Sequence, residues 1–488
     1  MDTSMNLAMV LPELVLSLGA IALMLVSAWG GNGSTRAVSI AAIFVLAGAL
    51  VALTGPASSG GAAFGGLFLA DAFSSFAKVL IYIATVVAII MAPGFFQRTS
   101  GEDLRPEYPV LMLLSAAGMG MMVSAGDMLT LYVGLELQSL SAYVLASFMR
   151  RDTRSAEAGL KYFVLGALAS GILLYGISLV YGFTGTTMFD GIANAYAADH
   201  LLAGEARSLG LMFGLVFVFA GLAFKIAAVP FHMWSPDVYE GAPTPVTAFF
   251  ASAPKVAAVA LSVRVAVEAM GPATDQWRQI VIFAALASIV LGAVAAIGQT
   301  NIKRLLAYSS INNVGFALIG LAAGTAEGVA SVLTYMTIYV VMTLGSFLVV
   351  LQMRGADGQS VESIASLSGM SRTRPGLAAA LAIFMFSLAG IPPLFGFYAK
   401  FAVFQAAVHA GLFPLAVIGI AASVIGAYYY LRVVKTMYFD EPAPAFAPVA
   451  NPVEGGLIAL TAIFVSPLGY FLIPALGVWT MAAAQALF

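Results

Sequence analysis

The residues best suited to chemistry in this sequence are ionisable side chains that interrupt long apolar segments. One glutamate and six basic residues lie inside such segments: Glu136, Lys78, Lys161, Lys225, Lys255, Arg264 and Lys400. A charge held at the centre of a bilayer costs about 2.5–3.5 kcal/mol even on a lenient insertion scale. Residues of this kind are expected to face the interior of a helix bundle and to mark a path for ions or protons.

Proton transfer is the chemistry that this combination of residue types favours. Loss of water lowers the pKa of a buried lysine and raises that of a buried glutamate, which brings both types toward neutrality. A nearby carboxylate favours the charged form of a lysine. A change in the distance between a glutamate and a lysine would therefore load or release the proton on the lysine.

Glu136 is the strongest single candidate for such a role. It lies about ten residues from either end of a predicted helix over 127–149, and a carboxylate has no long stem with which to reach the membrane surface. Ser139 and Tyr143 follow at i+3 and i+7, which places a polar stripe on one face of that helix. We therefore predict a functional role for this carboxylate.

Among the lysines, depth in the membrane favours two. Lys255 lies about ten residues into a predicted helix over 245–269, beyond easy reach of the surface. Lys400 lies within the long apolar stretch 376–410. Lys225 lies closer to the end of its helix, so its depth alone is weaker evidence.

Prolines predict that two helices are interrupted beside these lysines. Pro230 removes a backbone N–H and clashes with the carbonyl of residue 226, so its helix should break just after Lys225. The segment Gly390–Pro393 (GIPP) should break the stretch ahead of Lys400 in the same way. Interrupted helices are tolerated in membranes where the freed backbone groups face protein or water. Two such helices, five spans apart, fit an inverted-repeat transporter.

Four further ionisable residues are weaker candidates. Lys161 lies near the end of its predicted helix, where a functional role and a reach to the membrane surface are equally open. His232 follows the first predicted break, and the ordinary pKa of histidine lies near neutrality; a capping or interfacial role is the alternative. Lys78 and Arg264 lie near helix ends, and we expect their long side chains to extend to the surface.

Composition independently indicates an all-α protein that crosses a membrane many times. Of 488 residues, 61% are apolar and 9% are charged, whereas soluble domains carry about 25% charged residues. A crossing helix needs about 20 apolar residues. That length predicts about 14 helices, near 8–28, 37–56, 72–93, 108–124, 127–149, 158–183, 208–230, 245–269, 277–298, 301–323, 328–352, 376–410, 413–434 and 455–476.

The charge balance and the scarcity of sulfur and imidazole exclude several functions. The net charge of −2, from 21 basic and 23 acidic residues, gives no indication of nucleic-acid binding. The absence of cysteine excludes disulfides, thiolate metal sites and iron–sulfur ligation on this chain. Three histidines leave little for a histidine-based metal site.

Basic residues in the loops predict the orientation, because loops on the cytoplasmic side are enriched in Lys and Arg. With the N-terminus outside, the outer loops hold two basic residues, Arg207 and Arg278. The inner loops hold thirteen: Arg36, Arg98, Arg105, Arg150, Arg151, Arg154, Lys303, Arg304, Arg354, Arg372, Arg374, Arg432 and Lys435. Both termini should therefore face the outside of the membrane.

The predicted helices divide the chain into four parts. An N-terminal three-helix segment over 1–105 is followed by a first five-helix repeat over 106–270. A second five-helix repeat over 271–440, comprising helices 9–13, should have inverted topology because five is an odd number of crossings. A C-terminal helix occupies 441–488.

Four motifs resemble a known family. The stretch from Gly221 to Thr247 (GLAFKIAAVPFHMWSPDVYEGAPTPVT) is similar to the antiporter-like subunits of respiratory complex I. The segments 251–256 (ASAPKV), 131–141 (LYVGLELQSLS) and 390–400 (GIPPLFGFYAK) resemble, within that family, the N-type subunits of bacterial NADH-quinone oxidoreductase. The resemblance extends over essentially the whole chain.

This resemblance implies roles for particular residues. By their matching positions, Glu136 and Lys225 would form the modulating pair, Lys255 the central relay and Lys400 the gate toward the far half-channel. Lys161 and His232 match accessory positions on the polar axis. The resemblance also implies a multi-pass protein of the bacterial inner membrane whose partners are other membrane-arm subunits, including neighbouring antiporter-like subunits. No flavin, iron–sulfur cluster or nicotinamide is implied on this chain, because redox chemistry belongs to the partners.

Three other functions compete with this interpretation. A subunit of an Mrp-type cation/proton antiporter shares the fold and the Glu–Lys pair, although the context of Pro254 and Lys255 argues against it. A small-molecule transporter usually has about twelve spans and a recognisable substrate cavity, and the sequence shows neither. A purely structural scaffold would leave at least three charges in the middle of the membrane without a purpose.

Overall fold

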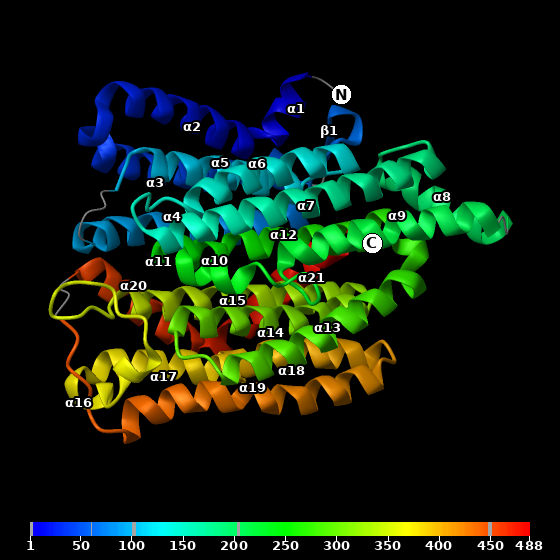
Figure 1. Cartoon of the computed structure of the whole chain (residues 1–488). Helices are drawn as coiled ribbons and strands as arrows, with labels where there is room; N and C mark the ends of the chain where they lie inside the picture. Colours follow the sequence, from blue (N-terminus) through cyan, green and yellow to red (C-terminus); the bar gives the residue numbers. More distant parts are fainter. Residues whose placement is uncertain (1–2, 60, 100–103, 203–204, 448–450) are drawn as a thin grey trace.

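The computed structural model describes residues 3–59, 61–99, 104–202, 205–447 and 451–488. Its long helices lie side by side in one bundle, from the N-terminal helices at one edge to α19 at the opposite edge (Figure 1). The last helices return to the middle of the bundle, where α21 packs against α15 and α4. The predicted class, an all-α membrane protein with many crossings, is confirmed.

The first half of the described chain contains twelve α-helices and one short hairpin. The strands β1 (Gly61–Ala63) and β2 (Phe68–Ala70) pair antiparallel with Ala62 opposite Leu69. The helices are α1 (Thr3–Met9), α2 (Leu11–Gly30), α3 (Thr35–Ala52), α4 (Ala72–Arg98), α5 (Glu107–Val123), α6 (Met128–Ala146), α7 (Thr153–Thr184), α8 (Phe189–Leu202), α9 (Glu205–Ile226), α10 (Ser235–Gly241), α11 (Thr244–Phe250) and α12 (Ala253–Arg264).

The remaining helices build the second half of the bundle. They are α13 (Thr274–Ile297), α14 (Ile302–Ala322), α15 (Ala326–Leu351), α16 (Met370–Thr373), α17 (Pro375–Ala389), α18 (Phe395–His409), α19 (Phe413–Phe439), α20 (Pro452–Val465) and α21 (Ile473–Gln485). Across the described residues, eleven helical segments are long and apolar enough to cross a membrane. Three shorter apolar helices, α5, α17 and α20, accompany them. The count of 14 crossings remains a prediction.

Both interruptions predicted from proline are present. The first falls between α9 and α10, and the second between α17 and α18. The Val229–Pro230 and Pro392–Pro393 peptide bonds are cis. Gly390 ends α17 with a φ of +82°, a conformation that favours glycine.

Two predicted helices differ from the structure. The helix predicted over 245–269 is divided into α11 and α12 at Ala251 and Ser252, and it ends in a π-helical turn, Val265–Ala269. Pro254 in the first turn of α12 has no N–H to continue the ladder from α11, which explains the division. The helix predicted over 455–476 is likewise interrupted, by the 3-10 turn Pro467–Leu472.

Burial separates the central helices from those that face outward. The apolar windows of α14 and of the segment Thr244–Ala269 are each 94% buried, and that of α15 is 89% buried. The window over α2 and α3, by contrast, is only 33% buried. The central helices therefore form the core, and it is there that ionisable side chains are shielded from lipid.

Candidate functional site

The polar stripe predicted on α6 faces the first interruption. Asp127 caps α6 by accepting hydrogen bonds from the N–H groups of Leu129 and Thr130. Ser139 is buried, whereas Glu136, one turn earlier, is half-buried. Within the described chain, the Oε1 atom of Glu136 is buried without a hydrogen-bond partner. This carboxylate oxygen can therefore accept a hydrogen bond from a further donor.

Lys225 meets this stripe from the end of α9. Its Nζ donates to Ser139 Oγ at 2.7 Å and lies 5.9 Å from the centre of the Tyr143 ring. Among the described residues, no ion pair within 4.0 Å joins Lys225 to Glu136. The structure thus brings the predicted pair to one face of α6, with the Ser139 hydroxyl as the direct partner of the lysine.

The interruption after α9 releases carbonyl groups, and side chains satisfy them. Helix ends leave carbonyls without intrahelical partners. Trp234 Nε1 donates to the carbonyl oxygen of Phe224 at 3.0 Å. Lys255 Nζ donates to the carbonyl oxygen of Ile226, the last residue of α9, at 2.7 Å. The interruption therefore creates the acceptor for the predicted central lysine.

Lys255 lies in the protein interior and does not face lipid. Only 1% of it is exposed, and its Nζ lies 5.7 Å from the centre of the Trp234 ring. The C-terminal end of a helix carries a partial negative charge of about half an elementary charge. The end of α9 and the aromatic face together stabilise the ammonium without a carboxylate.

Lys400 repeats this arrangement at the second interruption. Its Nζ donates to the carbonyl oxygen of Ala389, the last residue of α17, at 2.9 Å. It also lies 4.5 Å from the centre of the Phe316 ring. Ser387 Oγ accepts the N–H of Gly396, so a side chain supports this interruption too. Each interrupted helix therefore ends against one buried lysine and one aromatic ring.

A buried network of neutral polar side chains lies in the second half of the bundle. Tyr335 donates to Asn313 Oδ1 at 2.6 Å, Asn313 Nδ2 donates to Tyr430 at 3.2 Å, and Tyr430 lies 2.5 Å from Ser309 Oγ. Tyr335 also lies beside Phe316, the ring under Lys400. Sequence reasoning missed this network; the adjacent asparagines at 312 and 313 in an apolar helix were the available signal.

Lys161 belongs to an ion network at the end of the bundle where α7 begins. Its Nζ lies 2.7 Å from Glu157 Oε1 and 2.6 Å from Asp237 Oδ2. Asp237 Oδ1 also forms an ion pair with Arg304 Nη1 at 2.6 Å. This carboxylate therefore joins α7 and α10 to the start of α14. Sequence reasoning missed Asp237 and Arg304, because acidic and basic residues in predicted loops are usually solvated.

Glu362 extends this network from the loop after α15. Lys303 Nζ lies 3.1 Å from its carboxylate and also donates to the carbonyl oxygens of Glu240 and Ala242. Burial alone would raise the pKa of the Glu362 carboxyl, but Lys303, Asn301 and Arg154 lower it below its ordinary value. This carboxylate is therefore held in its charged form.

His232 lies in the turn between α9 and α10. It is half-buried, and its Nδ1 atom has no hydrogen-bond partner among the described residues. Its role in proton transfer or in capping stays a prediction. The described residues contain no group of three or more His, Cys, Asp or Glu side chains placed to hold a metal ion.

The expectation that Lys78 and Arg264 extend to the membrane surface is wrong. Both side chains are 0% exposed. Lys78 pairs with Glu13 at 2.7 Å, which joins α4 to α2. Arg264 pairs with Asp71 at 2.6 Å and with Glu268 at 2.8 Å, which joins α12 to the start of α4. The fold brings carboxylates close to these two cations. The carboxylates replace the water molecules that would otherwise solvate the cations.

Comparison with known proteins identifies the family. The sequence model described as NADH:quinone oxidoreductase/Mrp antiporter, TM, matches residues 125–426. NADH-quinone oxidoreductase subunit N of Rhizorhabdus wittichii is 71% identical over 489 residues, covering 100% of both chains. The chain belongs to the NADH:quinone oxidoreductase/Mrp antiporter family. The matched range contains the predicted site residues Glu136, Lys161, Lys225, Lys255 and Lys400.

Solved structures support the assignment to the NADH:quinone oxidoreductase/Mrp antiporter family. A chain of respiratory complex I from Thermus thermophilus, solved with bound aureothin, aligns with a TM-score of 0.80 at 31% identity, covering 95% of this chain and 97% of that one. A chain of the Mrp complex from Dietzia sp. aligns with a TM-score of 0.81 at 22% identity, covering 100% and 98%. The second likeness shows the shared fold alone.

Proposed function

We propose that this chain is a proton-translocating membrane-arm subunit of an NADH-quinone oxidoreductase. The observation that carries the proposal is the placing of a buried lysine at the end of each interrupted helix: Lys255 on Ile226 and Lys400 on Ala389. The relative named NADH-quinone oxidoreductase subunit N, at 71% identity over the whole chain, supports the identity of the complex.

In the proposed mechanism, protons move between amines along the core. Lys225 holds a proton against the Ser139 hydroxyl, and Glu136 on the same helix face favours the charged lysine. A lysine that gives up its proton becomes a neutral amine and can accept the next one. Lys255 receives the proton from the side of Lys225, and Lys400 releases it toward the far side. Lys161 and His232 are accessory groups near the start of this path.

The proposal assigns the redox chemistry to partner subunits. Quinone reduction in the partner subunits would drive proton movement through this chain, by a change in conformation or in charge at the ends of the proton path. The partners are other membrane-arm subunits, including neighbouring antiporter-like subunits. The parts 106–270 and 271–440 are proposed as the inverted repeats, with 1–105 and 441–488 flanking them.

We further propose a bacterial inner-membrane location with both termini on the periplasmic side. The distribution of basic residues in the loops supports this orientation. Arg278, on the proposed outer side, donates to the carbonyl oxygen of Ala322 beside the end of α14. The side chain of Arg207, the other basic residue assigned to that side, lies outside the described residues.

A subunit of an Mrp-type cation/proton antiporter is the second candidate. The likeness to the Dietzia chain, with a TM-score of 0.81, favours it as a fold. The higher identity to the complex I chain, 31% against 22%, favours the NADH-quinone oxidoreductase. An antiporter would transport protons in exchange for sodium or potassium without any redox input.

Copurification tests the proposed function directly. The chain, tagged at one terminus and expressed in its own host, is extracted in mild detergent and assayed for NADH oxidation by quinone. We expect the tag to recover a complex with this activity. Recovery of a complex without NADH oxidation, but with cation-dependent proton exchange in vesicles, would overturn the proposal in favour of the antiporter.

A further inference from the structure

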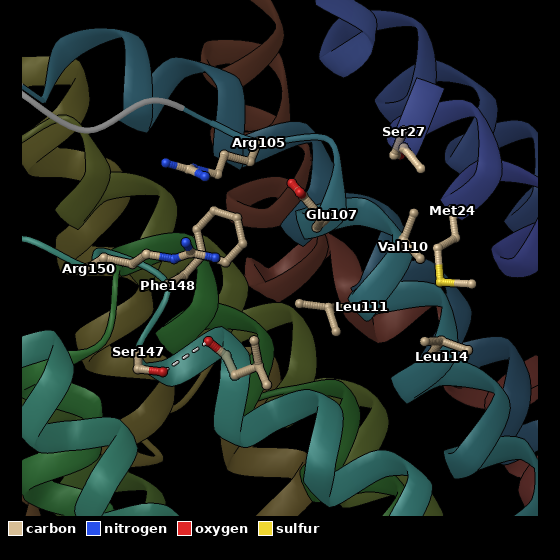
Figure 2. A pocket seen from close by; sticks show the side chains of 12 residues that line it. Met24, Ser27, Arg105, Glu107, Val110, Leu111, Leu114, Ser147, Phe148 and Arg150 are labelled. Carbon is tan, nitrogen blue, oxygen red and sulfur yellow. Dashed lines mark hydrogen bonds between the residues drawn. The ribbon is translucent and has the colours of Figure 1, made fainter. Parts of the chain in front are cut away.

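A groove with apolar walls opens between α2, α5 and α6 (Figure 2). Its volume is about 490 Å³, within the range of about 300–1,000 Å³ that is typical of ligand sites. Met24, Leu111, Leu114 and Val144 supply much of its wall. None of its lining residues belongs to the proposed proton path, so the groove needs a separate explanation.

Polarity changes along the groove in one direction. Arg105 and Glu107 lie at the start of α5, and Arg150 lies just beyond the end of α6. Ser27 and Ser147 lie near the ends of α2 and α6, Phe148 lies beside Arg150, and the other apolar wall residues lie further along the helices. In Figure 2, Arg105 and Arg150 lie at one end of the groove and Met24 and Leu114 at the other.

The charged end of the groove has capacity for an anion. In the part of the chain that the structure describes, the guanidinium groups of Arg105 and Arg150 have no ion pair or hydrogen-bond partner, and both residues are exposed. Among the described residues that line the groove, Glu107 is the single acidic one, so the charged end of the groove, its rim, has a net charge of +1 there.

The charged end of the groove lies at the depth expected for a membrane surface. Trp29, near the end of α2, is 84% exposed at the same end of the bundle. Tryptophan is enriched where lipid meets water, because its ring is apolar and its N–H is polar. The groove therefore has its charged end at the depth of lipid headgroups and its apolar walls at the depth of acyl chains.

We infer that this groove is a binding site for one anionic phospholipid. The two guanidinium groups would bind the phosphate, the serine hydroxyls would lie beside the glycerol esters, and an acyl chain would follow the wall formed by α2, α5 and α6. A protein partner would need acidic side chains at the rim and a continuous apolar ridge below them. A cationic end above an apolar wall instead matches a phospholipid, with its anionic headgroup above acyl chains.

Lipid titration of the purified full-length chain tests this inference. The delipidated chain is titrated with dioleoyl phosphatidylglycerol or dioleoyl phosphatidylcholine, and bound lipid is counted by native mass spectrometry. We expect one tight phosphatidylglycerol and no equally tight phosphatidylcholine. Arg105→Gln together with Arg150→Gln should weaken this binding by about 30-fold, from roughly fivefold for each basic residue. Arg372→Gln, another arginine assigned to the inner side, is the matched control and should change nothing.

Three results would overturn the inference. The first is equal binding of the two lipids, and the second is undiminished phosphatidylglycerol binding by the double variant. The third is a partner chain seated in the groove in a structure of the assembled complex. If the double variant folds poorly, Leu114→Trp gives a second test, because it fills the acyl wall and leaves both arginines in place. Tight phosphatidylglycerol binding by that variant would likewise contradict the site.

Discussion

Lys255 and Lys400 occupy equivalent chemical positions although they come from different parts of the fold. Each donates to the carbonyl of the last residue of an interrupted helix, Ile226 or Ala389. In the described residues, neither lysine has a carboxylate within ion-pair distance. Loss of a proton therefore leaves no buried carboxylate without its counter-ion, which would cost several kcal/mol. This position suits a lysine that changes charge repeatedly.

Glu136→Gln tests the electrostatic role of the carboxylate on α6. The variant removes one negative charge from the face of α6 that carries Ser139 and contacts Lys225 of α9. We expect NADH-driven proton pumping by the assembled complex to fall about fivefold, the effect of roughly 1 kcal/mol. Glu136→Asp keeps the charge, shortens the reach and should retain more activity. Glu327→Gln, an exposed carboxylate paired with His409, is the matched control. Full pumping by an assembled Glu136→Gln complex would refute the role.

Residue type and depth allowed prediction of the main candidates but not of their partners. A carboxylate or a lysine in the middle of an apolar segment is visible in the sequence, and Glu136, Lys255 and Lys400 were selected on that basis. Lys225 was selected because Pro230 predicts a break just after it. Lys78 was misjudged, because its partner Glu13 lies on another helix and no local pattern links the two. Contacts of this kind depend on helix packing, which the sequence does not state.

The second interruption, between α17 and α18, needs a glycine at position 390. A Cβ added at Gly390 would lie 2.8 Å from Cδ of Lys400, and its φ of +82° is unfavourable for any other residue. We expect Gly390→Ala to displace Lys400 and to lower proton pumping, in addition to the strain of about 1–2 kcal/mol that a left-handed residue brings. Pumping rate and thermal stability of the assembled complex measure the two effects.

Gly411→Ala separates these two effects. Gly411 has a φ of +77°, but a Cβ there would meet nothing within 4 Å. This variant should therefore lose similar stability while it keeps its pumping rate. Equal pumping by both alanine variants would show that the close approach of Gly390 to Lys400 has no functional role.

At the scale of elements, two helix interruptions near prolines were predicted, and a third was missed. Pro230 and Pro392–Pro393 lie inside apolar runs, where a proline must disturb a helix. Pro254 lies about ten residues into the helix predicted over 245–269, so the same rule applies to it. The division between α11 and α12 could therefore have been predicted from the sequence, but it was missed. A proline in the middle of an apolar run indicates an interruption, whereas one in the first turn of a helix does not.

At the scale of the whole molecule, ion pairs join parts that are distant in the sequence. Arg98 of α4 pairs with Glu454 of α20 at 3.0 Å, and Gln352 also donates to that buried carboxylate. At the same end of the bundle, Asp237 and Glu362 join α7 and α10 to α14 and to the loop after α15. Of these contacts, the pair between Asp237 and Arg304 crosses the proposed boundary between the two repeats, so it can transmit movement between them.

Glu362→Gln tests the strength of the pair between Lys303 and Glu362. It leaves the buried Lys303 ammonium without its carboxylate, and we expect a loss of about 3–5 kcal/mol in the free energy of unfolding at pH 7. Because the folded pKa of Glu362 is lowered, its contribution is complete above the ordinary glutamate pKa of about 4.3 and disappears as the pH falls through the folded value. The melting temperatures of wild type and variant should therefore differ at pH 7 and converge only when the pH falls below the lowered pKa of folded Glu362.

Glu441→Gln is the control for this measurement. Its side chain is 94% exposed and lies 3.9 Å from Arg372. A surface pair of this kind contributes little, so the variant should melt like the wild type at every pH. A melting temperature for Glu362→Gln that matched this control at pH 7 would show that the pair between Lys303 and Glu362 does not stabilise the fold.

Proton pumping by Lys255→Met is the most direct measurement of the central claim, which is that protons pass along buried lysines at the interrupted helices. Methionine roughly preserves volume and cannot carry a proton, so the complex should assemble while the rate of NADH-driven proton uptake into proteoliposomes falls about tenfold or more. Lys255→Arg should fail to restore it, because arginine stays protonated in proteins. Lys435→Met, at an exposed lysine, should pump normally. Wild-type pumping by an assembled Lys255→Met complex would contradict the account.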